Sequence, residues 1–412
     1  MSTARSAPCR ICGATLAPFM SFGRMPIANG FLDEAAIATE YFYELAPAFC
    51  VRCATFQLIT QPPPQQMFHD HYAFVSSSSR RMAEHFQGFA ALVIARARGL
   101  DQDPLVVEIG SNDGTMLQHF KGAGLRCVGV EPSGNVVEAA QSRGLDTIEA
   151  FFSHALAIEL RARSGPATAI VAANVICHVA DFHDLAAGIH HLLARDGVLL
   201  FEDPYLGDML DQHAYDQIYD EHVFMWSATS VAGAVARHGL ELIDVERQTT
   251  HGGSMRYVCA HAGRHRVAPS VGALLTEEQR AGLNHPATYD RFRGDCETSR
   301  HDFRDLLTSL RAQGKRIAGY AATSKSTTVL NYCGIGRSII DFIADSTPIK
   351  QGKLTPGSHI PVRSPEVFAA DPPDFAVLFA WNHSSEIFAK ETAFTAGGGK
   401  WIRFVPAPAI ID

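Results

Sequence analysis

Four cysteines near the start of the chain form two pairs that could hold a metal ion. Cys9 and Cys12 make one CxxC pair, and Cys50 and Cys53 make the second. Each pair can bind a metal from a tight turn, and four thiolates complete a tetrahedral zinc shell without an open position for a reactant. Two disulfides or four unrelated thiols are the alternatives, but paired CxxC motifs in a chain of this size favour zinc. The spacing therefore predicts a structural Zn²⁺ site.

A second motif joins an apolar segment to a glycine-rich turn. The segment 105–109 runs directly into a turn that contains Gly110, Asn112 and Gly114. Glycines at the carboxyl end of a strand let the backbone approach a ligand, and open α/β sheets bind cofactors at that edge. Glu131 follows about twenty residues later, after a second apolar segment, where a carboxylate can accept hydrogen bonds from ribose hydroxyls. The order indicates a nucleoside-containing cofactor, with a plain connecting turn as the alternative.

The composition of this turn distinguishes between two cofactors. A dinucleotide site normally has G-x-G-x-x-G, which leaves a helix N-terminus free for pyrophosphate. Here the turn is G-x-N-x-G, with Glu108 before it and Asp113 inside it. Carboxylates oppose a pyrophosphate but suit a cationic sulfonium, so the turn predicts S-adenosylmethionine (SAM) rather than NAD. Asn174 and either Phe151 or Phe152 follow later strands where further cofactor contacts are expected, although each aromatic ring could be a core residue.

A dense group of titratable side chains follows the apolar segment 197–201. Tyr219, Glu221 and His222 lie close together in the chain, and His178 follows the preceding apolar segment. Such groups at the mouth of an α/β sheet are where pKa values are tuned for proton transfer. Each histidine could also be an ordinary surface or core residue. We expect these four residues to form the catalytic group.

Alternating apolar and helical segments must position these motifs. Short apolar segments alternate with helical stretches, which predicts a doubly wound, Rossmann-like parallel sheet in an α/β fold. The expected strands of this sheet are 105–109, 126–130, 169–173 and 197–201. A helix is expected within 67–100, with its N-cap among the serines at 76–79. Prolines at 62–64 separate this unit from the cysteine-containing segment.

A second strand and helix alternation follows the charged, helical connector 274–313. Its expected strands are 316–321, 338–344 and 374–380, which predicts a Rossmann-like C-terminal unit. Strand-end residues there could border a diphosphate and a nucleotide: Thr323, Lys325, Ser326, Trp381, Asn382 and His383. A unit used only for packing is the alternative. The predicted domains are a zinc-binding domain at 1–65, a SAM methyltransferase domain at 66–265 and a nucleotide-sugar-binding domain at 266–412.

Bulk composition excludes several classes of protein. The chain has 412 residues, 47% of them hydrophobic and 19% charged, and a net charge of −8. This composition is typical of a globular enzyme, and the charge gives no attraction to nucleic acid. No apolar segment reaches the roughly 18 residues of a membrane helix, and the first residues lack a signal core. We expect a cytoplasmic protein, monomeric, without nucleic-acid or membrane partners.

The motifs together resemble those of the C-methyltransferases of deoxysugar and antibiotic-sugar biosynthesis. The resemblance covers nearly the whole chain and rests on CRICG, CVRC, EIGSNDG, FEDPYLGD, YDEH, HGGSMRY, GYAATSKS and FAWNH in this order. It implies a SAM-dependent enzyme with His222 as general base, Tyr219 and Glu221 beside it, and His178 close to the sugar. Tyr72 would contact the cofactor. Phe74 departs from the family, which has a second tyrosine there, so a role of that hydroxyl does not carry over.

The resemblance also implies a substrate and a mechanism. The substrate would be a 4-keto sugar linked to thymidine diphosphate or another nucleotide, because a ketone acidifies the adjacent C3 or C5. His222 would remove the proton while Glu221 orients its ring, and Tyr219 and His178 would donate to the enolate oxygen. A sugar O-methyltransferase, an NAD-dependent sugar oxidoreductase and a zinc-ribbon binding module fused to a degenerate methyltransferase fold are the alternatives.

Overall fold

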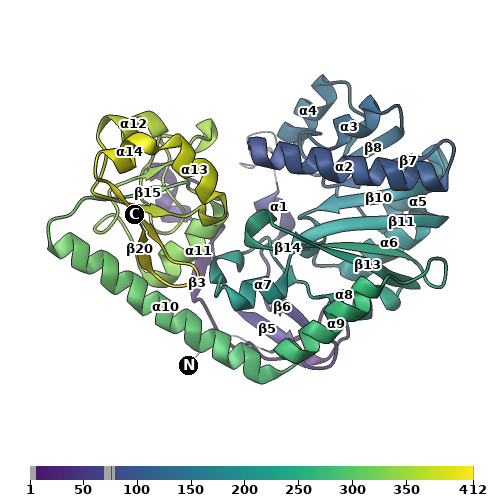
Figure 1. Ribbon diagram of the computed structural model, residues 1–412, viewed down its shortest axis with the longest axis horizontal. Helices are drawn as coiled ribbons and strands as arrows, with labels where there is room; N and C mark the ends of the chain where they lie inside the picture. The colour runs from purple at the N-terminus through teal and green to yellow at the C-terminus, as the bar shows by residue number, and fades with distance from the viewer. Residues whose placement is uncertain (1–5, 69–75, 77–78, 412) are drawn as a thin grey trace.

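The computed structural model describes residues 6–68, 76 and 79–411 of the chain. Figure 1 shows two α/β units side by side, one containing β7 (Leu105–Ile109) and the other β15 (Ile317–Tyr320). Helix α10 (Pro286–Ala312) runs below the C-terminal unit, and α9 (Pro269–Ala281), which precedes it, lies below the central unit. The N-terminal segment, drawn in purple, lies where the two units meet.

The N-terminal segment is built from short antiparallel strands. β1 (Ala7–Pro8) pairs with β2 (Thr15–Leu16), β3 (Arg24–Pro26) with β4 (Phe42–Glu44), and β5 (Pro47–Cys50) with β6 (Thr55–Leu58). Cys9 and Cys12 lie in the turn of the first pair, whereas Cys50 ends β5 and Cys53 lies in the turn that follows it. On its other side β6 pairs with β12 (Phe224–Met225), a strand contributed from the middle of the chain. The N-terminal segment is thereby joined to the residues that directly follow His222.

The central sheet has the strand order β13-β14-β11-β10-β7-β8-β9 in the part of the chain that the structure describes. Its strands are β7, β8 (Arg126–Glu131), β9 (Thr147–Glu149), β10 (Ala167–Ala173), β11 (Leu193–Pro204), β13 (Leu240–Gln248) and β14 (Ser254–His261). The strands from β7 to β11 are parallel, and β14 runs antiparallel to β11 and β13. The order reverses between β7 and β10, and ligands bind at the carboxyl ends of strands at such a point.

Helices cover both faces of the central sheet because successive side chains of each strand point to opposite sides. Val106 packs into the cluster formed with α2 (Arg80–Leu100), and Val107 packs into the cluster formed with α5 (His154–Ser164) and α6 (Phe182–Leu192). The Ser79 side chain caps α2 by accepting a hydrogen bond from the Met82 N–H. The shorter helices are α1 (Pro64–Met67), α3 (Leu117–Gly122), α4 (Gly134–Ser142), α7 (Leu206–Asp211) and α8 (Ala228–Ala236).

The C-terminal unit follows α9 (Pro269–Ala281) and α10. Its sheet has the order β17-β16-β15-β18-β19-β20 among the described residues, and only β20 runs antiparallel to its neighbour. The strands are β15, β16 (Ile343–Ala344), β17 (Val362–Arg363), β18 (Phe375–Leu378), β19 (Lys400–Arg403) and β20 (Ala409–Ile411). The helices are α11 (Ser324–Cys333), α12 (Pro365–Ala370), α13 (Ser384–Lys390) and α14 (Thr392–Ala396).

The predicted fold class is confirmed by this arrangement. Each strand expected in the central sheet is present, and the N-cap of α2 lies within the predicted serines. The expected strand 338–344 is shorter, since only Ile343 and Ala344 pair with β15. None of the described helices combines the length and apolar character that crossing a membrane requires.

Candidate active site

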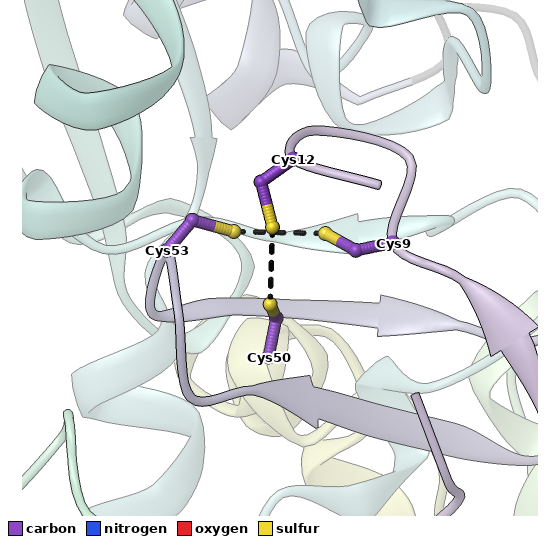
Figure 2. Close-up of side chains that lie close together, drawn as sticks. All are labelled: Cys9, Cys12, Cys50 and Cys53. Carbon is purple, nitrogen blue, oxygen red and sulfur yellow. Dashed lines mark hydrogen bonds between the residues drawn. The ribbon is translucent and has the colours of Figure 1, made fainter. Parts of the chain in front are cut away.

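The four cysteine sulfurs converge on one point, as Figure 2 shows. Cys9 Sγ lies 3.6 Å from Cys53 Sγ, Cys12 Sγ lies 3.5 Å from Cys50 Sγ, and all four atoms lie within 4.8 Å of one another. A tetrahedral zinc ion with Zn–S bonds of about 2.3 Å requires sulfur separations of about 3.8 Å. The four residues therefore fit the predicted zinc site.

Hydrogen bonds around the sulfurs also suit thiolates. Cys9 Sγ accepts from Gln57 Nε2 at 3.1 Å and from the Ile11 N–H at 3.4 Å. Thr55 Oγ1 lies 3.2 Å from Cys53 Sγ. Donors to sulfur favour the charged form that binds metal. With four thiolates and no open position, the site is structural.

A cavity of about 590 Å³ lies at the carboxyl ends of β7, β8 and β10. Residues from all three parts of the chain line it, from Asn29 in the N-terminal segment to His383 in the C-terminal unit. Gly110, Asn112, Glu131, Phe152, Asn174, His178, Tyr219, Glu221, His222, Thr323, Lys325, Asn382 and His383 are the predicted site residues among its lining. The structure thus brings the predicted cofactor, catalytic and substrate residues to one cavity.

The glycine turn after β7 forms one end of this cavity. Gly110 has φ +70°, and a Cβ atom there would lie 2.3 Å from Val175 Cγ2. Glu131 at the end of β8 accepts from the Asn112 N–H at 3.1 Å and from the Ser133 N–H at 2.9 Å. These bonds fix the acidic residue beside the turn, and burial raises its pKa.

Two features of the turn differ from expectation. Gly114 does not line the cavity; its φ of +78° and its approach to Leu145 make it a packing residue. The expectation that Glu108 and Asp113 face the sulfonium is wrong, because both are buried away from the cavity lining. Asp113 pairs with Arg143 at 3.4 Å, and burial holds the pKa of Glu108 well above its usual range.

Asn174 and Phe152 form the neighbouring wall. Asn174 has φ 57°, and no hydrogen-bond partner for its buried Oδ1 is found among the described residues. This acceptor in a cavity beside Glu131 fits a ligand that carries an amino group, as SAM does. Phe152 is 9% exposed and lines the cavity, as does the more exposed Phe151. Tyr72, the other predicted cofactor residue, lies outside the described residues.

Two stacked imidazoles and a phenol line the cavity. The rings of His178 and His222 are 5.3 Å apart with an interplanar angle of 25°. His222 Nδ1 lies 2.7 Å from the Gln217 carbonyl oxygen, and Nε2 lies 2.8 Å from Tyr219 Oη. Because a carbonyl only accepts, we assign the proton to Nδ1, so that Nε2 accepts from the Tyr219 hydroxyl.

Burial keeps both imidazoles neutral near pH 7. Desolvation lowers the pKa of His178 to about 3. Burial is the largest cause, and the neighbouring His178 the second, of a His222 pKa well below its usual range. His178 Nε2 is buried, and the described residues offer it no hydrogen-bond partner. The site therefore contains one imidazole whose lone pair is held by a phenol and one with a ring nitrogen that no described residue binds.

Glu221 does not orient the His222 ring as expected. The Gln217 carbonyl holds Nδ1, and the Glu221 carboxylate accepts from Asn29 Nδ2 at 2.6 Å. The adjacent Asp220 is fully buried, and its carboxylate accepts from the Ala28 N–H at 3.2 Å. The N-terminal segment thus holds two acidic side chains of the loop that carries His222.

Lys325 is the principal C-terminal residue at the cavity. It is 7% exposed, and its Nζ donates to the His251 carbonyl at 3.1 Å. Burial lowers the pKa of Lys325, and the nearby Asp216 carboxylate acts in the opposite direction. Thr323 caps α11 by accepting from the Ser326 N–H at 3.2 Å, which places Ser326 behind the cap rather than on the cavity lining.

Trp381 also lies off the cavity lining. Its Nε1 donates to Asp216 at 2.8 Å, and its ring packs where a side chain at Gly252 would stand. It therefore joins the C-terminal unit to the central one. The neighbouring Asn382 and His383 do line the cavity, and burial lowers the pKa of His383 to about 4.

Sequence reasoning missed three contributors to the cavity. Lys350 is 8% exposed, donates from Nζ to the Ala322 carbonyl at 2.8 Å, and lies 3.9 Å from Asp345. Asn29 and His251 line the cavity as well. His251 begins the HGGSMRY motif, which contributed to the family resemblance, but nothing in the sequence around Lys350 or Asn29 indicates a site.

Comparisons with known proteins cover each part of the chain. A family model described as a zinc binding domain matches residues 9–68, and one described as a methyltransferase domain matches residues 82–245. A third, described as a C-methyltransferase C-terminal domain, matches residues 249–406.

Individual proteins are similar over different extents. The chain is 37% identical over 407 residues to C-methyltransferase NovU of Streptomyces niveus, covering 98% of this chain and 96% of that protein. Magnesium protoporphyrin IX methyltransferase from Synechocystis PCC 6803, solved with bound SAM, is 12% identical over 44% of this chain and 79% of its own, with a TM-score of 0.33. The CcbJ methyltransferase from Streptomyces caelestis is 15% identical over 43% of this chain and 90% of its own, with a TM-score of 0.34.

Proposed function

The chain belongs to the SAM-dependent C-methyltransferases, and we propose that its acceptor is a nucleotide-linked 4-keto deoxysugar. SAM is the methyl donor, and zinc is the structural metal of the four cysteines. Family membership favours methyl transfer to carbon over the sugar O-methyltransferase and the NAD-dependent oxidoreductase. The proposed nucleotide is thymidine diphosphate, and the proposed methylated carbon is C3, next to the ketone.

One observation carries the proposal: a neutral imidazole pair lines the same cavity as the glycine turn after β7 and two buried lysines. Gly110, Asn112 and Glu131 would hold the nucleoside of SAM, and the Asn174 side chain would accept from its amino group. When bound, the cofactor supplies an electrophilic methyl group. The base, the donors to the enolate oxygen and the groups that bind the diphosphate must all be side chains of this protein.

His222 would act as the general base. Its Nδ1–H bond to Gln217 leaves the Nε2 lone pair toward Tyr219 and the cavity. In the proposed reaction the Tyr219 hydroxyl leaves Nε2 for the ketone oxygen, and Nε2 takes the proton from C3. The electrons of the C–H bond move into the enolate, which makes C3 nucleophilic. Bound SAM would supply the methyl group to this carbon, and the electron pair of the broken sulfur–methyl bond would remain on the sulfur.

Two donors would stabilise the enolate oxygen. The Tyr219 hydroxyl is within reach of the base, and His178 presents a buried ring nitrogen for which no partner is found in the described residues. Because the pKa of His178 is about 3, its ring is neutral and has one N–H to donate. Preorganised donors of this kind contribute about 3 to 4 kcal/mol each to transition-state stabilisation.

Lys325 and Lys350 would hold the diphosphate. Burial lowers the pKa of both lysines, and an anion would offset that desolvation by favouring their charged forms. Thr323, Asn382 and His383 would border the nucleotide. We also propose the domain bounds 1–65, 66–265 and 266–412, with one copy of the chain sufficient for activity.

The proposal is tested with SAM and a panel of nucleotide-linked 4-keto sugars, with the new methyl group located by NMR. We expect methylation at C3 and none of the matching sugar reduced at C4. His222→Asn should bind SAM normally and lose about 10²- to 10⁴-fold in turnover. Methylation of the reduced sugar on oxygen, or full activity of the variant, would refute the mechanism.

Isotope exchange separates proton removal from methyl transfer. With S-adenosylhomocysteine in place of SAM, the wild-type protein in D₂O should exchange the C3 hydrogen of the keto sugar for deuterium. His222→Asn should not. Exchange at C5 instead of C3 would move the site of methylation, and its absence in the wild type would count against an enolate.

A further inference from the structure

Gln61 connects the two loops that carry the active-site histidines. Its single Nε2 atom donates to the His178 carbonyl at 3.2 Å and to the Asp220 carbonyl at 3.3 Å. One carbonyl belongs to the segment after β10, and the other lies in the loop before His222. The two protons of one amide nitrogen thus bridge segments that are far apart in the sequence.

The zinc-binding segment holds Gln61 in place. Gln61 lies three residues after β6, the strand that leaves the Cys50–Cys53 turn. Pro62 follows it, and a residue before proline is confined to extended conformations. The side chain is therefore presented from a stiff piece of backbone that directly follows the zinc-binding strands.

The same segment holds the His222 loop at further points. The Leu58 N–H donates to the Val223 carbonyl at 2.8 Å, and β6 pairs with β12 directly after it. Asn29 binds Glu221, as described above. Among these contacts, Gln61 is the one that also reaches the His178 segment.

We propose that Gln61 is a positioning residue that sets the distance between the His178 and His222 rings, an inference that rests on their proposed catalytic roles. The rings are stacked 5.3 Å apart, and each is attached close to a carbonyl that Gln61 binds. Without the amide, the two loops lose their common donor, and the base and the enolate donor no longer hold a fixed separation. The zinc site thereby acts on the geometry of catalysis and not only on folding.

The test compares Gln61→Met, Gln61→Lys and the control Gln66→Met in the full-length zinc-bound protein. Methionine keeps the length of the side chain but removes both donors, and lysine restores donors. Gln66 is exposed on α1 and lies outside the cavity lining. Each protein is measured for zinc content, SAM affinity, kcat on the keto sugar, and amide hydrogen exchange over 176–179 and 219–223.

Gln61→Met should keep its zinc and its SAM affinity, exchange faster over both segments, and lose about 10²-fold in kcat, since a displacement of about 1 Å has that effect. Gln61→Lys should recover part of kcat, and Gln66→Met should match the wild type. Wild-type kcat or unchanged exchange in Gln61→Met would overturn the inference. If the wild type methylates no sugar of the panel, the proposed function fails. Amide hydrogen exchange over 176–179 and 219–223 then decides by itself whether Gln61 positions the two loops.

Discussion

Glu278 is the buried carboxylate whose replacement has the most clearly defined consequence. It lies on α9, is 2% exposed, and binds the start of α8. One oxygen accepts from the Ala228 N–H at 2.6 Å and from the Tyr205 hydroxyl at 3.0 Å. The other accepts from the N–H and the hydroxyl of Thr229, at 2.8 and 2.6 Å. The carboxylate therefore satisfies two of the N–H groups that every helix leaves free at its N-terminus.

Glu278→Gln keeps the shape of this side chain but replaces one acceptor oxygen with an NH₂ group. In either orientation of the amide, the N–H of Ala228 or that of Thr229 then faces a donor, and an unsatisfied buried N–H costs about 1–3 kcal/mol. Loss of the negative charge at the helix N-terminus adds about 0.3–1 kcal/mol. We expect a destabilisation of about 1.3–4 kcal/mol, or roughly 3–16 °C in the melting temperature of a unit of this size.

The neighbouring Glu277 provides a matched control. Its side chain is 61% exposed and pairs with Arg247 at the surface. Exposed pairs contribute about 0–1 kcal/mol, so Glu277→Gln should melt close to the wild type. Thermal unfolding and urea unfolding of the two variants make the comparison. Equal shifts in both variants, or a shift below about 1 kcal/mol for Glu278→Gln, would refute the reasoning from burial.

Three further predictions concern metal, pH and backbone conformation. Cys12→Ser should lose the zinc that the wild type holds at one ion per chain, and metal analysis with circular dichroism would show whether the N-terminal strands unfold with it. Because the pKa of His178 is about 3 when folded, against about 6.5 unfolded, its contribution to stability is complete above pH 6.5 and falls as the pH drops toward 3. Between pH 7 and 5 the wild type should lose about 2 kcal/mol more than His178→Phe, measured by urea unfolding at both pH values. Gly110→Ala should weaken SAM binding in calorimetry because its Cβ would meet Val175 at 2.3 Å. Gly88→Ala is the control: Gly88 is exposed on α2 with nothing within 4 Å of an added Cβ, so this variant should stabilise the protein by about 0.5–1 kcal/mol. Unchanged SAM binding in Gly110→Ala, or destabilisation in Gly88→Ala, would contradict this view of the turn.

Local features of the sequence predicted much of the fold and the metal site. The Cys9–Cys12 and Cys50–Cys53 pairs needed only their spacing, because each pair is formed within one turn. The strand before Gly110 and the acidic end of β8 could be recognised for the same reason, because each of these features is formed by residues that are close together in the sequence. His222 could be named because its neighbours in sequence, Tyr219 above all, are also its neighbours in space.

The missed features depend on contacts between distant parts of the chain. Asn29 and Glu221 are separated by 192 residues, and Gln61 and Asp220 by 159. No local pattern marks such partners, because a lone amide is an ordinary surface residue until the fold places a carboxylate or a carbonyl beside it. The same holds for Trp381, whose position beside a strand end suggested a ligand wall, whereas the glycine turn opposite it provides a packing site.

The electrostatics of the cavity favour carbon over oxygen as the methyl acceptor in the proposed reaction. Burial holds the pKa of His222 well below its usual range, so its ring is a weak base and adds no positive charge beside a cationic methyl donor. A weak base removes a proton from carbon only if the developing oxyanion is stabilised at the same time. In the proposed reaction the Tyr219 hydroxyl and the His178 ring nitrogen, which no described residue binds, would do this. A hydroxyl acceptor has no adjacent oxyanion to stabilise, so two donors beside one base would have no role in its methylation. The arrangement is therefore understandable for a ketone that becomes an enolate, and it explains why both imidazoles are kept neutral in one cavity.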